Sequence, residues 1–184
     1  SYRYCMAKSK TGSFWLTETI ALPDTASSGD RFSGTIDLGA YVDVGDQQAL
    51  AIELVDFIHQ AGSGYAGSVQ SMLTSGGAIT TQLTDLNPGD VFVRADDNSL
   101  VASSALNIET SIATRDSDFY PDSFGKLDES RMVVNDSLYV VAGPDLADIA
   151  AVDVYVTVRI KCRIVKLSTK DWMAIAIQST ASDN

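Results

Sequence analysis

The sequence of 184 residues predicts an all-β protein, either a sandwich or a barrel. Three observations predict this class. Several segments alternate apolar and polar residues with a period of two. Clusters of Gly, Ser, Thr, Asp and Pro separate these segments, as in proteins with many turns. No segment combines helical periodicity with the length of a long helix. Strands with one apolar face bury it against a second sheet, so we expect one domain with a real core.

The clearest strand signal is the segment VDVYVTVRIKCRIVKL, residues 152–167. Its apolar face, which is rich in β-branched residues, consists of Val152, Val154, Val156, Val158, Ile160, Cys162 and Ile164. The opposite face consists of Asp153, Tyr155, Thr157, Arg159, Lys161 and Arg163. This alternation predicts a long strand with one buried face. The phase slips at residues 165–167, which predicts a bulge or the end of the strand.

The other strands in the first half follow in chain order. Phe14–Leu22 alternates and stops at Pro23-Asp24, and residues 31–38 form the next candidate. Residues 48–60 fit either a strand or a helix. We favour a strand, because the neighbours are strands and no capping pattern frames a helix. Residues 68–74 and 78–85 flank Ser-Gly-Gly and predict a hairpin.

The second half continues the pattern. Asn-Pro-Gly-Asp at 87–90 predicts a turn. The remaining strand candidates are residues 91–94, 99–103, 105–114, 131–134 and 137–142. A long polar loop covers residues 115–130, and residues 144–151 are compatible with one helical turn. After the link Ser-Thr-Lys-Asp, the segment WMAIAIQ at 172–178 predicts a final strand.

The net charge of −11 argues against a general nucleic-acid-binding protein. Its distribution is uneven, because residues 1–17 hold three basic residues and no acid, and residues 159–170 hold five and no acid. The two cysteines form no framework of disulfides, which is compatible with a reducing cytosol. No apolar run reaches the length of a membrane span and no secretory signal is visible. The chain begins with Ser1, which is consistent with processing or truncation.

No catalytic, metal or cofactor motif stands out. His59 is the sole histidine, and we expect a structural or surface role for it. One histidine and two distant cysteines cannot supply a zinc site. The acidic loop around Asp116, Asp118, Asp122 and Asp128 has carboxylates that could bind Ca²⁺, but we expect it to be simply solvated. We therefore expect no enzyme activity, no cofactor and no metal.

Three features together resemble the single jelly-roll capsid proteins of small icosahedral viruses, including some with circular single-stranded DNA. One is the basic, acid-free start SYRYCMAKSK directly before the first strand. The second is a set of eight or more strands with long loops in one domain. The third is the ending, DSLYVVAG, then VDVYVTVRIKCRIVKL, then DWMAIAIQ. The likeness covers most of the chain and is architectural.

The resemblance implies a two-sheet antiparallel sandwich, a single jelly roll with about eight core strands, and self-assembly into a shell in the virion. We expect a basic N-terminal segment over 1–13, the jelly roll over 14–180 and a polar tail over 181–184. The resemblance implies that Arg3, Lys8 and Lys10 face the genome, although three cations are few for packaging. On the cationic strand face, we expect Arg159, Lys161 and Arg163 to contact acidic loops of a neighbouring copy. An exposed edge kept soluble by cations is the alternative.

Other functions also fit the sequence. A carbohydrate-binding or adhesin module would use exposed aromatic residues to stack on sugar rings. The candidates are Trp15, Trp172, the region of Tyr65 and the loop 119–124. An enzyme on the same scaffold, and a trimeric cytokine-like or fibre-knob protein, are further alternatives. Glycan binding by a monomer, as opposed to assembly into shells, would separate the first of these from a capsid protein.

Overall fold

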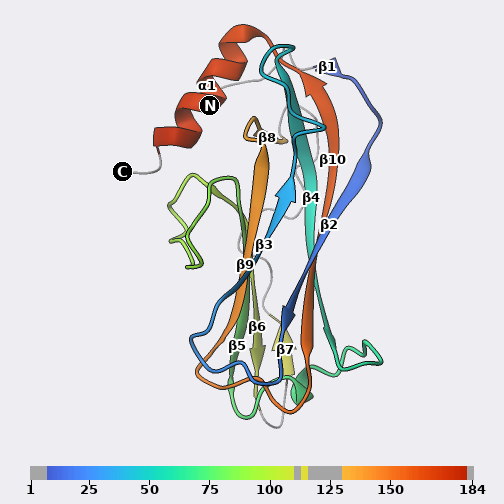
Figure 1. Cartoon of the computed structure of the whole chain (residues 1–184), viewed down its shortest axis with the longest axis vertical. Coiled ribbons are helices and arrows are strands. Elements are labelled where there is room, and N and C mark those ends of the chain that lie inside the picture. Colours follow the sequence, from blue (N-terminus) through green and yellow to red (C-terminus); the bar gives the residue numbers. More distant parts are fainter. Residues whose placement is uncertain (1–7, 110–112, 116–129, 182–184) are drawn as a thin grey trace.

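The computed structural model describes residues 8–109, 113–115 and 130–181 (Figure 1). This part of the chain forms β1 (Lys8–Ser9), β2 (Phe14–Leu22), β3 (Phe32–Asp37), β4 (Gln48–Ala61), β5 (Gly77–Thr84), β6 (Leu100–Ile108), β7 (Ala113–Arg115), β8 (Arg131–Val133), β9 (Ser137–Asp145), β10 (Val154–Lys166) and α1 (Thr169–Ala181). A short 3-10 helix, η1, spans Val69–Ser71. No helix in these ranges is long and apolar enough to cross a membrane.

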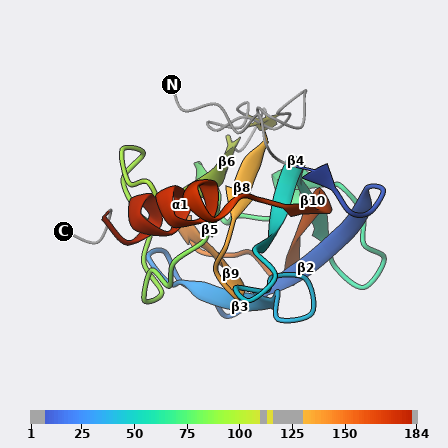
Figure 2. The same ribbon diagram turned by 90° about the horizontal axis from the view of Figure 1, so that it is seen from above.

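The strands form two antiparallel sheets packed face to face (Figures 1 and 2). The first sheet has the order β2-β10-β4-β8, with β1 extending the β10 edge beyond β2. The second has the order β3-β9-β5-β6-β7. Apart from β1 and β7, the strands pair in a nested order: β2 with β10, β3 with β9, β4 with β8, and β5 with β6. These nested pairs alternate between the two sheets, which is the jelly-roll topology. The predicted fold class is therefore confirmed.

The core lies between the two sheets. The inward residues of β10, from Val154 to Cys162, have no exposed surface, so the predicted apolar face is confirmed over this range. Val152 and Ile164, at its two ends, are half-buried. They pack against inward residues of the second sheet such as Leu83 and Val140. The strand ends at Lys166, inside the range where the sequence pattern slips. The phase changes there because Val165 packs in a second cluster on the outer face of the sheet.

β4 confirms the strand expected over residues 48–60 and explains why its pattern was ambiguous. Its pairing with β10 shifts between Leu54 and Ile52, so Glu53 is the extra residue of a β-bulge. Ile52 and Val55, three residues apart, both enter the core. A spacing of three within a strand imitates part of a helical pattern, which is the origin of the ambiguity.

Two short segments are not the strands that the sequence predicts. Residues 68–74 contain η1 in place of the first arm of a hairpin. Residues 91–94 lie in the connection between β5 and β6, outside both sheets. The side-chain amide of Gln82 satisfies the backbone of Val93 in place of a neighbouring strand. It donates to the Val93 carbonyl (3.0 Å) and accepts from the Val93 N–H (2.8 Å). The expected helical turn at 144–151 is also absent, because β9 continues to Asp145.

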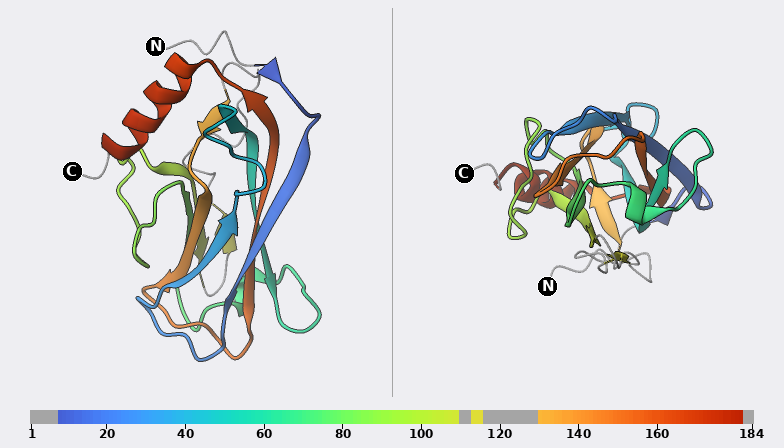
Figure 3. Two further views of the ribbon diagram at one scale, coloured as in Figure 1. Left: turned by 45° about the horizontal axis from the view of Figure 1, so that its top comes forward. Right: turned by 90° about the horizontal axis from the view of Figure 1, so that it is seen from below.

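The predicted final strand at 172–178 is wrong, because this segment belongs to helix α1. Ser168 caps the helix: its Oγ accepts a hydrogen bond from the Asp171 N–H (3.1 Å). Trp172 and Ile175, three residues apart, face the outer side of the first sheet and are nearly buried. They form a second cluster with Ala49, Ala51, Met132, Val134, Val165 and Leu167. Figures 1 and 3 show α1 at the end of the sandwich where β10 ends.

Candidate functional site

The outer face of the first sheet is where the predicted cationic side chains of β10 lie. Arg159, Lys161 and Arg163, which we call the basic stripe, alternate with the buried core residues of β10 and are partly exposed. β2 lies on one side of them and β4 on the other. α1 packs on the outer face of this sheet over Ala49, Ala51, Met132 and Val165. The three side chains of the stripe remain partly accessible on a rigid surface.

Trp15 on β2 is the main apolar side chain beside the stripe. It is 44% exposed, and the Arg159 guanidinium lies 4.5 Å from the centre of its ring. This is cation–π geometry. Lys161 is the residue directly opposite Trp15 in the strand pairing. Within the described residues, neither Arg159 nor Lys161 forms a salt bridge. This part of the stripe thus combines an exposed aromatic ring with two cations that form no salt bridge there. Asp56 of β4 lies directly opposite Arg159 in the strand pairing.

Arg163 differs from the other two cations because its charge is compensated within the chain. Its Nε donates to the Glu53 carboxylate, and its Nη2 donates to Ser13 Oγ (3.1 Å). Ser13 Oγ also donates to that carboxylate, at 3.0 Å from each oxygen. Glu53 is the bulged residue of β4, so the bulge aims its carboxylate at β10. The Arg163–Glu53 pair therefore joins β4, β10 and the segment before β2.

Cys162 lies between these cations in sequence but points into the core, as the sequence predicts. Burial, with a smaller effect of the Glu53 charge, raises the pKa of its thiol from 9.0 to about 12. A thiol that stays protonated is a poor nucleophile and a poor metal ligand. Cys162 therefore acts as a small core residue.

Of the N-terminal cations expected to face a genome, Arg3 lies outside the described residues. Lys8 is in β1 and lies directly opposite Lys166 of β10. Two like charges at this position destabilise the pair unless an anion or solvent screens them. Lys10 is exposed, and its Nζ donates to Gln48 Oε1 (2.8 Å). Lys8 and Lys10 therefore lie beside the end of β10, together with Lys166.

The aromatic residues considered for carbohydrate stacking do not form one platform. Trp172 is 6% exposed and packs under α1. Tyr65 is exposed, but its ring lies 5.4 Å from that of Tyr155. The aromatic and acidic loop at 116–129, with the possible calcium ligands, lies outside the described residues. Elsewhere, no cluster of three or more His, Cys, Asp or Glu could hold a metal in the residues that are described. His59 is partly buried on β4, opposite Val156.

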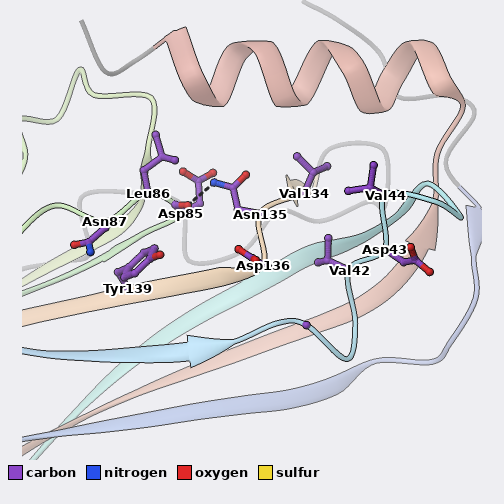
Figure 4. Close-up of a pocket in the computed structure, with 11 residues that line it drawn as sticks. Val42, Asp43, Val44, Asp85, Leu86, Asn87, Val134, Asn135, Asp136 and Tyr139 are labelled. Carbon is purple, nitrogen blue, oxygen red and sulfur yellow. Dashed lines mark hydrogen bonds between the residues drawn. The ribbon is translucent and has the colours of Figure 1, made fainter.

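A second accessible feature, which the sequence did not reveal, is a cleft at the α1 end of the sandwich (Figure 4). We call it the end cleft, and its volume is about 740 Å³. Three separate segments line it: the β3–β4 connection, the start of the β5–β6 connection and the turn between β8 and β9. Its lining residues are Gly39, Val42, Asp43, Val44, Asp85, Leu86, Asn87, Val134, Asn135, Asp136 and Tyr139. The cleft combines apolar walls with three carboxylates.

Asp85 is the buried acid of the end cleft, with 3% of its surface exposed. Burial raises the pKa of this carboxyl, and the Arg131 guanidinium opposes that effect. Arg131 Nη2 donates to Asp85 Oδ2 (2.9 Å), whereas Asp85 Oδ1 accepts no hydrogen bond within the described residues. The Asn135 amide donates to the Asp85 carbonyl (2.5 Å) and fixes the β8–β9 turn against this wall (Figure 4). Asp43 and Asp136 are the solvent-exposed acids that line the cleft.

Comparison with known proteins adds a structural likeness. No family model and no curated protein matches the sequence. Among solved structures, the chain is similar to VP1 of Merkel cell polyomavirus, determined in complex with 3'-sialyllactosamine. The sequence identity is 8%, the match covers 86% of this chain and 98% of that chain, and the TM-score is 0.39.

Proposed function

We propose that this protein is a structural subunit that assembles with copies of itself into a closed shell around a nucleic acid, as a viral capsid protein does. The observation that carries the proposal is the outer face of the first sheet, where an exposed Trp15 lies beside the cations Arg159 and Lys161, neither of which forms a salt bridge within the described residues. Trp and Arg dominate the energetics of protein interfaces. A jelly roll presents such a face on a rigid wall, and capsid proteins are among the proteins that use it.

The charge distribution supports contact between identical copies. The chain has a net charge of −11, whereas the stripe is cationic. A stripe of this sign is attracted by the acidic surface of another copy, and opposite charges across an interface fix its register. In this proposal, Arg159 and Lys161 contact the neighbour. Arg163, held by Glu53, supports the strand that carries them.

The proposal assigns the inner, genome-facing role to Arg3, Lys8 and Lys10. The position of Lys8 opposite Lys166 supports it, because phosphate would relieve the repulsion between them. Binding through these few cations should be weak and sensitive to salt. For a single strand, the slope of log K against log salt is about −0.7 per neutralised phosphate, so we expect a slope of about −2.

Assembly is tested directly by sedimentation velocity and negative-stain microscopy of the purified protein. We expect large closed particles, in equilibrium with free subunits, whose abundance rises with protein concentration. A protein that stays monomeric at all concentrations, salt levels and pH values where it is folded would contradict the proposed function. Addition of single-stranded nucleic acid, followed by fluorescence anisotropy, tests the genome-facing role with Lys8→Glu/Lys10→Glu as the comparison.

A carbohydrate-binding module is the second candidate, favoured by the exposed rings of Trp15 and Tyr65. Arg159 lies over the Trp15 ring, so a sugar would have to displace the guanidinium or bind the other side of the indole. A glycan array separates the two functions. A monomer that binds a glycan and loses it on Trp15→Ala would favour the module over the shell subunit.

A further inference from the structure

The geometry points to a specific contact between copies: we propose that the basic stripe and Trp15 of one copy bind in the end cleft of the next. This inference rests on the proposed function and names the two surfaces that assembly would use. The occupant of the cleft is a second copy of this chain. The chemistry of the two surfaces and their positions on the molecule support this contact.

The end cleft has the chemistry of a receptor for a cationic and apolar projection. Val42, Val44 and Leu86 give it apolar walls, and Val44 is 69% exposed. Asp43 and Asp136 are exposed carboxylates that form no salt bridge within the described residues. A long cationic side chain satisfies both features, because its stem covers apolar surface while its head meets a carboxylate.

The wall of the cleft also holds an unused acceptor. Asp85 Oδ1 is buried and accepts no hydrogen bond within the described residues, although Arg131 binds the other oxygen of the same carboxylate. A buried acceptor without a donor is costly, and a donor from a partner would relieve this cost. Lysine and arginine supply such donors and no acceptors.

The basic stripe supplies the complementary groups. Arg159 and Lys161 form no salt bridge within the described residues, and they flank a Trp15 ring that is 44% exposed. At about 740 Å³, the end cleft lies in the range of sites that hold one or a few large side chains or a small ligand. The acids of one surface and the cations of the other are therefore opposite in charge. None of them forms a salt bridge within the described residues, although Asp56 of β4 lies directly opposite Arg159 in the strand pairing.

The two surfaces share no residue, and no salt bridge joins them within the described residues. The stripe lies on the outer face of the first sheet. The cleft lies under α1 and extends to Tyr139, on the outward side of β9 in the second sheet (Figure 4). Each copy can therefore contact one neighbour through its basic stripe and another neighbour through its end cleft. Such a head-to-tail contact builds rings when the rotation closes, which is the kind of contact that a shell requires.

Charge exchange tests the contact. The cleft variant is Asp43→Asn with Asp136→Lys, in which asparagine retains the oxygen that accepts the Gly45 N–H (2.9 Å). The stripe variant is Arg159→Glu with Lys161→Glu. The control is Asp24→Lys with Glu109→Lys, two exposed acids that do not line the end cleft. Circular dichroism and thermal unfolding verify that each variant is folded, and sedimentation velocity reports assembly.

We expect the cleft variant and the stripe variant each to lower assembly at least tenfold, and the control to leave it unchanged. A chain with all four changes, or an equimolar mixture of the two variants, should recover assembly because the charges are again opposite. Folded variants that assemble like the wild type would overturn the contact while leaving the shell function intact. So would a loss of assembly that neither combination recovers. A wild-type chain that never assembles would overturn the proposed function itself, and the contact with it.

Discussion

At the scale of single residues, the β-bulge in β4 places Glu53 in contact with Arg163 of β10. The side chain of Glu53 is 15% exposed and that of Arg163 is 30% exposed. Glu53→Gln keeps the shape but removes the charge that both Arg163 and Ser13 contact. We expect a loss of about 1–3 kcal/mol in the free energy of unfolding. Urea denaturation measures it, with the exposed Glu109→Gln as control; equal midpoints for the two variants would contradict this account.

Cys162 gives a prediction about pH at the same scale. Because burial raises the pKa of its thiol from 9.0 to about 12, the unfolded chain loses this proton first as pH rises. Between pH 9.0 and about 12, Cys162 therefore lowers the free energy of unfolding as pH rises. Below pH 9.0, its thiol is protonated in both states and does not make stability depend on pH. In a Cys5→Ser background, we expect no reaction with a thiol reagent at about pH 8 in the folded protein, and rapid reaction after denaturation. Rapid labelling of the folded protein would show that the thiol is accessible.

At the scale of elements, α1 depends on its cap and on two anchors. Ser168→Ala removes the oxygen that accepts the Asp171 N–H and should cost about 1 kcal/mol. Trp172→Ala empties a nearly buried site and should cost about 3–5 kcal/mol, whereas Met173→Ala, at a side chain that is 51% exposed, should cost little. Amide hydrogen exchange along α1 and thermal unfolding report both effects. Equal costs at Trp172 and Met173 would mean that α1 does not pack as described.

The elements differ in how far local sequence decides them. β10 was predictable because one periodic pattern covers nearly the whole strand. In α1, residues 172–177 are all apolar. Such a run fits a strand and a helix equally well, because no polar residue marks the period. The Ser168-x-x-Asp171 cap was the signal that distinguishes them. The end cleft had no such signal, because Asp43, Asp85 and Asp136 meet only after distant strands have paired.

At the scale of the whole molecule, two electrostatic effects would compete in the proposed assembly. Copies with a net charge of −11 repel each other, while the proposed contact between the basic stripe and the end cleft is attractive. The repulsion acts between charges spread over whole molecules, at separations longer than the Debye length of about 8 Å at physiological salt. The attraction acts between groups in contact. Physiological salt therefore already screens much of the repulsion between whole molecules and little of the attraction between groups in contact.

This difference predicts how assembly responds to salt. Raising ionic strength to about 1 M shortens the Debye length to about 3 Å, which weakens contact pairs that retain some solvent. We therefore expect assembly of the wild type to weaken between physiological and molar salt. The variant Arg159→Gln/Lys161→Gln, in which the stripe is neutral, should respond much less. Sedimentation velocity across a salt series measures both proteins. Stronger assembly of the wild type at high salt would mean that apolar contacts, and not the pairing of stripe with cleft, dominate the interface, since screening would then only remove repulsion.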